Sequence, residues 1–231
     1  MSMIRRSLRV FLSLALCLPL LVSCASSTTA SVPAGCDQAG SPCLQGKATV
    51  QLTTSKGVIT LELDGDAAPV TAGNFLDLVK RGTYNGTVFH RVVRDPVPFV
   101  VQGGDPASSD PSTPKSQYGT GSFVDPSTGQ ARFVPLELAF NGEDQPRYGR
   151  VVSNPTELLQ LKLSHERGAL AMARSQAPDS ASAQFYIALK PLPELDGRYS
   201  VFGRVSEGLD VVDAIRQDDT IKRATVLTPG L

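Results

Sequence analysis

Thiols and imidazoles are the side chains that could form a redox, metal or nucleophilic site, and the 231 residues hold only 4 Cys and 2 His. Cys36 and Cys43 form a pair that an oxidising compartment would join in a disulfide, and the alternative is two free thiols. No other Cys and no nearby His completes a zinc shell around them. His165 is interpreted as structural. We therefore expect a small closed loop, and no metal or other cofactor.

The N-terminal segment has the layout of an export signal. Three arginines precede an apolar run over residues 10–22, which is too short for a comfortable membrane span. The run ends in Leu21-Val22-Ser23-Cys24, which resembles the lipobox of bacterial lipoproteins, and the polar stretch ASSTTASVPAG follows. The alternative is an ordinary signal peptide with a chance Cys.

These features predict the organisation of the chain. We expect residues 1–23 to be a signal peptide, residues 24–46 to be a tether anchored through lipid on Cys24, and residues 47–231 to be the folded domain. Several lipid chains on one Cys would anchor the protein stably, because each buried CH₂ contributes about 0.8 kcal/mol. The predicted location is therefore a membrane surface facing the periplasm, the cell exterior or a lumen.

The charge of the expected mature chain argues against a nucleic-acid partner. The full sequence has 22 basic and 22 acidic side chains, and residues 1–23 contain three Arg and no acid. Removal of the signal therefore leaves a small negative net charge and no basic stripe.

Short apolar runs must build the scaffold that positions any site. Residues 48–53 and 58–63 alternate or nearly alternate around Ser55-Lys56-Gly57, which predicts a β-hairpin. Pro69 opens a helix that Gly82 ends. Further short apolar runs cover residues 88–93, 99–102, 169–173, 185–189 and 201–205, and a second helix is expected at 209–215. Many short strands with two regular helices predict a mainly β fold, a closed antiparallel barrel.

Between these runs, residues 106–167 are rich in Pro, Gly and Ser. The stretch SNPTELLQLKL within them could form a short helix behind a cap at Ser153 or Asn154. A loop of this length in a compact domain is usually functional or partly ordered. We interpret it as an insertion that decorates the barrel.

Seven segments together resemble the cyclophilin family of peptidyl-prolyl cis/trans isomerases, and their order and spacing are specific. They are FHRVV (89–93), FVVQGGDP (99–106), GALAMARS (168–175), SAQFYIAL (182–189) and LDGRYSVFGRV (195–205), with APVTAGNF (68–75) and GLDVVDAI (208–215) resembling the two family helices. The resemblance covers residues 48–225 apart from the insertion. It implies a closed eight-stranded antiparallel barrel capped by two helices, and an isomerase that assists the folding of exported proteins.

The implied reaction suits the residues. A peptide bond before proline has a rotation barrier of about 18–20 kcal/mol, whereas its cis and trans forms differ by only about 0.5–1 kcal/mol. No bond breaks, so no nucleophile is needed, and a guanidinium can donate to the nitrogen of the twisted amide without losing its charge. The resemblance assigns that role to Arg91, with Gln102 orienting it and bonding a substrate carbonyl. The alternatives are a surface Arg and a solvated Gln on strands.

The resemblance also implies the residues that bind the substrate. Phe99, Val100, Tyr186 and Leu195 would line a proline pocket, His90 and Tyr199 its rim, and Ala173, Arg174 and Gln184 would contact the peptide backbone. The alternative for the apolar residues is ordinary barrel core, and His90 could equally be structural.

The sequence departs from the best-studied members of the family near this site. Arg174 stands where they carry Asn, Val100 replaces a Met, and the span from Arg91 to Phe99 is longer. The expected partners are Pro-containing polypeptides and, through Cys24, a membrane, and the protein is expected to be a monomer. A non-catalytic module that binds Pro-containing segments is the alternative function. A lipocalin-like barrel for a small molecule fits the motifs poorly.

Overall fold

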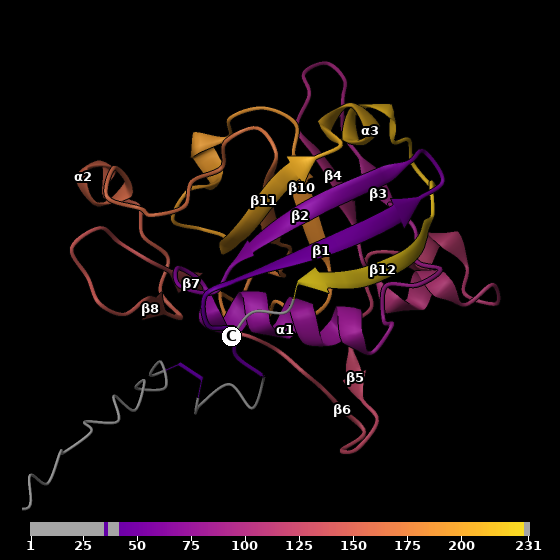
Figure 1. Ribbon diagram of the computed structural model, residues 1–231, viewed down its shortest axis with the longest axis horizontal. Coiled ribbons are helices and arrows are strands. Elements are labelled where there is room, and N and C mark those ends of the chain that lie inside the picture. The colour runs from indigo at the N-terminus through magenta and orange to yellow at the C-terminus, as the bar shows by residue number, and fades with distance from the viewer. Residues whose placement is uncertain (1–34, 37–41, 229–231) are drawn as a thin grey trace, which may run out of the picture. The chain divides into compact units, whose positions relative to one another are not determined.

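The computed structural model describes Gly35, Cys36 and residues 42–228 of the chain (Figure 1). The predicted signal peptide and the predicted lipid site at Cys24 lie outside the described residues. Among the residues that are described, no helix has the length and apolar character needed to cross a membrane.

Eight antiparallel strands form one curved sheet, in the order β12-β1-β2-β11-β9-β10-β4-β3. Every neighbouring pair in this order is antiparallel, as the sequence predicts. The strands are β1 (Lys47–Thr54), β2 (Val58–Asp64), β3 (Arg91–Val92), β4 (Val100–Gly103), β9 (Ala169–Met172), β10 (Phe185–Ala188), β11 (Val201–Glu207) and β12 (Ile221–Thr228).

The first hairpin follows directly from its alternating sequence. In β1, Val50 and Leu52 are fully buried, and in β2, Ile59 and Leu61 face the same core. Because successive strand side chains point to opposite faces, the intervening polar residues remain near solvent. The turn predicted at Ser55-Lys56-Gly57 joins the two strands, and the N–H of Thr54 donates to the oxygen of Gly57 across it. The sequence analysis did not predict β12, because its buried residues Ile221 and Ala224 are three positions apart and do not show the alternation of a strand.

The prediction of a closed barrel is wrong, because the sheet is open between its edge strands β3 and β12. The expected run at 88–93 forms a strand only at Arg91–Val92, which pairs with β4. Just before each edge strand, the two edges are joined by a bridge between Val88 and Thr220 and by backbone hydrogen bonds between residues 86–89 and 218–221. The contact stops there because the following strand β3, Arg91–Val92, pairs with β4 and not with β12.

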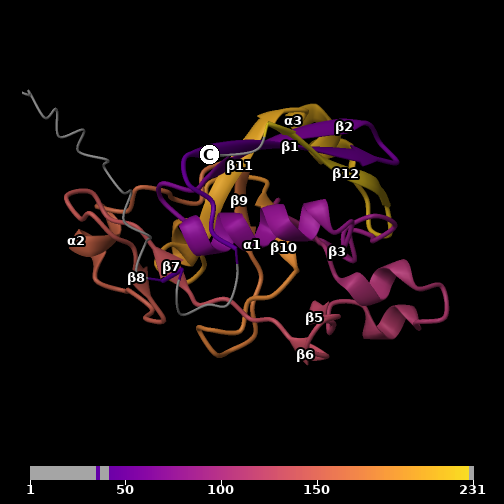
Figure 2. The ribbon, with the colours of Figure 1, turned by 60° about the horizontal axis from the view of Figure 1, so that its bottom comes forward.

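Helix α1 (Pro69–Lys80) packs beneath the curved sheet (Figure 2) and confirms the predicted helix with its Pro start and its Gly82 end. Its residue Phe75 is fully buried, and its ring contacts the rings of Phe185, Tyr84 and Phe202 at 4.9–5.3 Å between centroids. These ring contacts tie α1 to β10 and β11, which lie on the two halves of the sheet.

Helix α3 (Leu209–Ala214) ends one residue before the predicted position.

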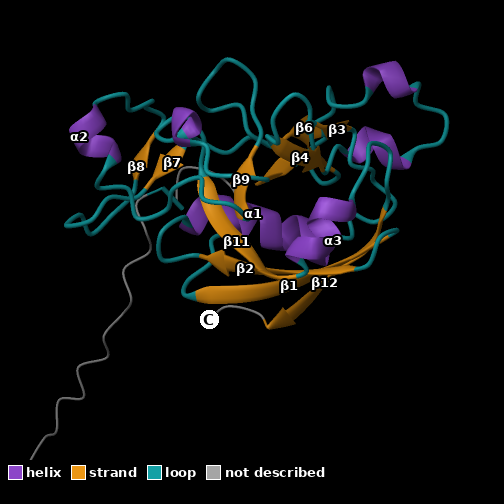
Figure 3. Ribbon diagram, turned by 90° about the horizontal axis from the view of Figure 1, so that it is seen from above, coloured by secondary structure: helices purple, strands orange, loops and turns teal. Residues whose placement is uncertain are grey.

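The segment between β4 and β9 is ordered and lies opposite the β1–β12 edge (Figure 3). It forms the short strand pairs β5 (Val124–Asp125) with β6 (Gln130–Ala131) and β7 (Glu137–Leu138) with β8 (Arg147–Tyr148). Helix α2 (Pro155–Leu158) begins behind Asn154, whose side chain accepts from two backbone N–H groups, as the sequence predicted. Part of this segment has its own apolar cluster, which consists of Leu136, Leu138, Phe140 and Val152.

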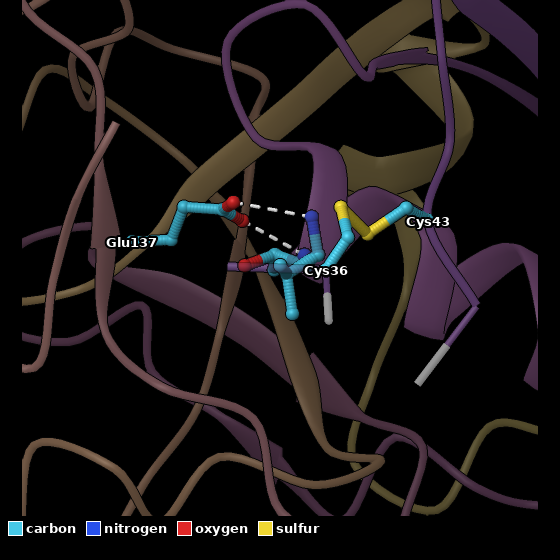
Figure 4. The surroundings of a disulfide bond; sticks show 5 residues. Cys36, Cys43 and Glu137 are labelled. Atoms are coloured by element: carbon cyan, nitrogen blue, oxygen red, sulfur yellow. Dashed lines mark hydrogen bonds between the residues drawn. A yellow bond between two sulfur atoms is a disulfide. The ribbon is translucent and has the colours of Figure 1, made fainter. Parts of the chain in front are cut away.

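One residue of this segment, Glu137, reaches the buried start of α1 (Figure 4). Its carboxylate accepts hydrogen bonds from the backbone N–H groups of Val70 at 3.1 Å and Thr71 at 2.8 Å. A disulfide joins Cys36 to Cys43 beside this helix end, with 5.8 Å between the Cα atoms. The segment does more than decorate the sheet, because it satisfies buried donors of the main core.

Candidate functional site

A cavity of about 240 Å³, here called the first cavity, opens beside strands β3, β4 and β10. Nine of the eleven residues that the sequence predicts for catalysis and substrate binding line it: Arg91, Phe99, Val100, Gln102, Ala173, Arg174, Tyr186, Leu195 and Tyr199. The other two, His90 and Gln184, lie nearby but do not line this cavity.

The pairing of β3 with β4 sets the polar edge of the first cavity. Arg91 stands opposite Gln102 in the register of the two strands, and its guanidinium donates to Gln102 Oε1 at 3.4 Å. Gln102 Nε2 in turn donates to Gln184 Oε1 at 3.2 Å. The Arg91 guanidinium also lies over the ring of Phe99, 5.8 Å from its centroid. The guanidinium is therefore held beside the apolar wall of the cavity by an amide chain that orients it.

The apolar walls of the first cavity belong to a cluster separate from the main core. Val100 and Tyr186 are buried members of this cluster, and Phe99, Leu195 and Tyr199 pack against it. Strand alternation explains the division, because Val101 and Phe185, the neighbours of Val100 and Tyr186, face the main core instead.

Behind the first cavity, a buried polar chain holds the wall residue Tyr186. The Tyr186 hydroxyl lies 2.8 Å from His165 Nε2, and His165 Nδ1 lies 2.7 Å from Asp196 Oδ1. The carboxylate of Asp196 can only accept, so His165 Nδ1 donates to it, and the other ring nitrogen, Nε2, shares a hydrogen bond with the Tyr186 hydroxyl. Burial raises the pKa of Tyr186 well above its usual range, which keeps the hydroxyl neutral. His165 therefore links β10 to the loop that carries Leu195.

A second cavity of about 370 Å³ adjoins the first and shares Gln102, Ala173 and Arg174 with it. Its other walls come from three short segments and are Gly119, Thr120, Gly121, Ser122, Phe133, Ser175, Ser180, Ser182 and Gln184. Gln184 belongs here, where its Nε2 donates to the backbone oxygen of Gly121 at 2.8 Å. The two cavities are thus neighbouring parts of one surface depression.

Asp105 builds one wall of the second cavity from behind. Its fully buried carboxylate accepts from the N–H groups of Ala107 at 2.9 Å, Gly119 at 2.6 Å and Gly121 at 3.2 Å. Gly121 is required there, because an added Cβ would lie 2.1 Å from an Asp105 carboxylate oxygen. His90 packs beneath Gly119, and burial lowers its pKa, which favours the neutral imidazole.

Sequence reasoning missed the walls of the second cavity and the buried chain behind the first. Gly119 and Gly121 fall in the segment interpreted as an insertion, and Asp105, whose carboxylate holds them, lies 14 and 16 residues earlier, too far for a local pattern to show the contact. Asp196 gave no signal, since only the fold brings it to His165. Among the residues that the structure describes, no cluster of three or more His, Cys, Asp or Glu side chains could hold a metal ion.

Arranged in this way, the site can bind an extended polypeptide. The first cavity offers an apolar wall with a guanidinium and an amide at its edge, and the second offers hydroxyl, amide and backbone groups for flanking residues. The first cavity is smaller than most small-molecule sites. It suits one apolar ring or side chain.

Comparison with protein families gives a match over residues 49–229 to the family described as cyclophilin type peptidyl-prolyl cis-trans isomerase/CLD. A protein of Synechocystis sp., whose name assigns it to the thylakoid lumen as a peptidyl-prolyl cis-trans isomerase, is 39% identical over 197 residues. This alignment covers 81% of the chain and 48% of the relative, so the chain spans about half of that protein.

A shorter relative and a solved structure resemble the chain over most of their length. A peptidyl-prolyl cis-trans isomerase of Helicobacter pylori is 35% identical over 182 residues, which cover 78% of the chain and 87% of the relative. The crystal structure of a Cryptosporidium parvum cyclophilin type isomerase matches with a TM-score of 0.57 and 23% identity, over 79% of the chain and 98% of that structure. The structural match supports the fold.

Proposed function

Because the chain belongs to the family of cyclophilin type peptidyl-prolyl cis-trans isomerases, a class of enzymes, we propose that its first cavity isomerises X-Pro bonds in polypeptides. The observation that carries the proposal is the Arg91 guanidinium at the edge of the apolar first cavity, tethered by Gln102. In this proposal the cavity receives the proline ring and the flanking backbone crosses Gln102 and Ala173.

The proposed mechanism is electrostatic. Amide resonance makes the planar bond resist rotation, and rotation localises a lone pair on the proline nitrogen. The Arg91 guanidinium, which stays charged, donates to that lone pair and stabilises the twisted amide more than the planar one. Gln102 has two roles in this proposal. Its side-chain oxygen accepts from Arg91, and its amide N–H donates to a substrate carbonyl.

Arg91→Ala tests this mechanism. Residues 44–231 would be assayed by protease-coupled isomerisation of a short peptide with one Ala-Pro bond. We expect kcat/KM to fall by about 100-fold or more, the usual cost of removing a donor that acts on the transition state. Arg91 is exposed, so the melting temperature should hardly change. Arg204→Ala, which removes another exposed strand guanidinium, is the matched control. Unchanged turnover by Arg91→Ala would refute the assignment.

The same experiment separates the enzyme from a binding module. If the wild type binds the peptide in an NMR titration but does not turn it over, the non-catalytic alternative is favoured. Loss of turnover in Arg91→Ala with retained peptide affinity would support catalysis by Arg91.

We further propose that the protein is exported, held at a membrane through lipid on Cys24, and assists the folding of exported proteins. The support is the N-terminal pattern of three Arg, an apolar run and Cys24. A second support is that the Synechocystis relative is named for the thylakoid lumen, a compartment reached by export.

A further inference from the structure

We infer that Arg174 is a specificity-determining residue that makes the site prefer polypeptide segments with an acidic side chain beside the proline. The inference rests on the proposed function, since it assumes that the first cavity holds the proline. Its substrate class is X-Pro segments in which Asp or Glu lies within two residues of the proline.

The position of Arg174 is the first reason. It lines both the first and the second cavity, so it lies where a substrate passes from one to the other. An extended chain advances about 3.3 Å per residue. A proline in the first cavity would therefore place the side chain of a neighbouring residue next to Arg174.

The fixed orientation of its guanidinium is the second reason. Nε and Nη2 donate to the backbone oxygen of Arg198 at 2.9 and 2.7 Å, and Nη1 donates to the oxygens of Ser175 and Gln176 at 2.9 and 3.0 Å. The group also lies over the ring of Tyr199, 4.7 Å from its centroid. Five N–H donors make four bonds, so one Nη2 hydrogen is left for a ligand. Ordering the side chain on binding costs little, because it is already held.

The balance of charge at the two cavities is the third reason. Among the described residues that line them, the charged side chains are Arg91 and Arg174, both cationic. The carbonyl partners of Arg174 carry no net charge, so its own charge is not neutralised. The carboxylates of Asp105 and Asp196 approach from behind the walls, where each accepts hydrogen bonds from within the fold. A substrate carboxylate would therefore meet two cations, and no acidic side chain lines either cavity.

A purely structural role for Arg174 predicts a different result. If the side chain only held the loop of Ser175 and Gln176, its loss would lower turnover of every peptide by the same factor. A specificity role changes the ratio between acidic and neutral peptides, whatever the effect on each. That ratio is measured within a single variant, so partial damage to the loop cancels.

The experiment uses peptides with one Ala-Pro bond and Glu, Gln or Lys at each position within two residues of it. Isomerisation would be followed by NMR exchange, which needs no coupling protease. At the position beside Arg174, we expect wild-type kcat/KM for Glu to exceed that for Gln by about twofold to fivefold, the range of an exposed ion pair. Lys should fall below Gln. High salt should reduce the ratio.

Arg174→Gln should bring the Glu-to-Gln ratio to about one, and Arg174→Lys, which keeps the charge without the fixed fork, should retain part of it. A ratio of one at every position in an active wild type, or a ratio that Arg174→Gln leaves unchanged, would overturn the inference alone. If the wild type turned over none of the peptides, the proposed function would fail instead. Dissociation constants for the same peptides would then decide whether Arg174 selects acidic segments.

Discussion

Replacement of Glu137 should reveal how strongly the segment between β4 and β9 supports the main fold. Ala68, the N-cap residue of helix α1, provides no side-chain cap, and Pro69 at the first position of the helix has no N–H. The next two N–H groups, of Val70 and Thr71, are buried, and the Glu137 carboxylate accepts from both. Glu137 therefore acts as the cap of α1 from a position 67 residues later in the chain.

The expected cost follows from these two donors. A buried donor left without its partner costs about 1–3 kcal/mol. Loss of the favourable charge at a helix N-terminus adds about 0.3–1 kcal/mol. Relief of the buried carboxylate offsets part of this, so we expect Glu137→Ala to lower the free energy of unfolding by about 3 kcal/mol. For a domain of this size the melting temperature should fall by about 6–12 °C. Glu137→Gln keeps one acceptor oxygen and should cost about half as much.

The pH dependence gives a sharper readout. Burial, opposed by hydrogen bonds from Thr71 and Val70, raises the pKa of Glu137 above the ordinary range of a glutamate. At pH values between the pKa of Glu137 in the unfolded state and its higher pKa in the folded state, the folded state binds more protons. The stabilisation from protonation of Glu137 is therefore complete at acidic pH and is lost as the pH rises through the folded pKa. The stability of the wild type relative to Glu137→Gln should therefore decrease as the pH is raised through that window.

Chemical denaturation of the wild type, both Glu137 variants and the control Glu143→Ala would test the reasoning. Glu143 belongs to the same segment, but its ion pair with Arg147 is only partly buried, so its loss should cost less than about 1 kcal/mol. If Glu137→Ala cost no more than Glu143→Ala, the role of Glu137 as the cap of α1 would be refuted.

Three further predictions concern the site and the N-terminal region. Tyr186→Phe leaves the buried Nε2 of His165 without its hydrogen-bond partner, so it should lower stability by about 1–3 kcal/mol and raise KM more than it lowers kcat. Tyr199→Phe, the control, should leave stability unchanged. A mass spectrum of the exported protein without reductant should show the loss of two hydrogens, and alkylation of both Cys36 and Cys43 in that sample would dismiss the disulfide. Cys24→Ser should leave an uncleaved precursor without lipid, and a wild type that fractionates as a soluble protein would argue against the anchor.

The scaffold was predictable where local sequence decides structure. The hairpin of β1 and β2 follows from alternation, and α1 follows from its Pro start and Gly end. The strand predicted over residues 88–93 is longer than β3, because apolar composition does not reveal where the hydrogen-bonded pairing with β4 ends. Closure of a sheet depends on such partners at long sequence separation, and a single chain pattern does not contain them.

The candidate site shows the same division. The residues on β3, β4 and β10 could be selected because short strings there resemble a known family, and the register of the strands places Arg91, Gln102 and Tyr186 side by side. The chain from Tyr186 through His165 to Asp196 could not be predicted, because its members come from different elements that only the complete fold brings together. The interpretation of residues 106–167 as decoration failed for the same reason, since burial of Glu137 depends on a helix far away in sequence.

These contacts make the segment between β4 and β9 a structural part of the site. At one end, the buried carboxylate of Asp105 holds Gly119 and Gly121 as a wall of the second cavity. Further along, Glu137 secures the start of α1, and Phe75 of α1 packs edge-on against Phe185, which immediately precedes Tyr186 of the first cavity. A shortened segment would therefore need new hydrogen-bond partners for the N–H groups at the wall of the second cavity and at the start of α1, because a buried donor without a partner costs more than a lost surface contact. Changes in this segment should consequently be tolerated at its exposed turns and not at Asp105 or Glu137.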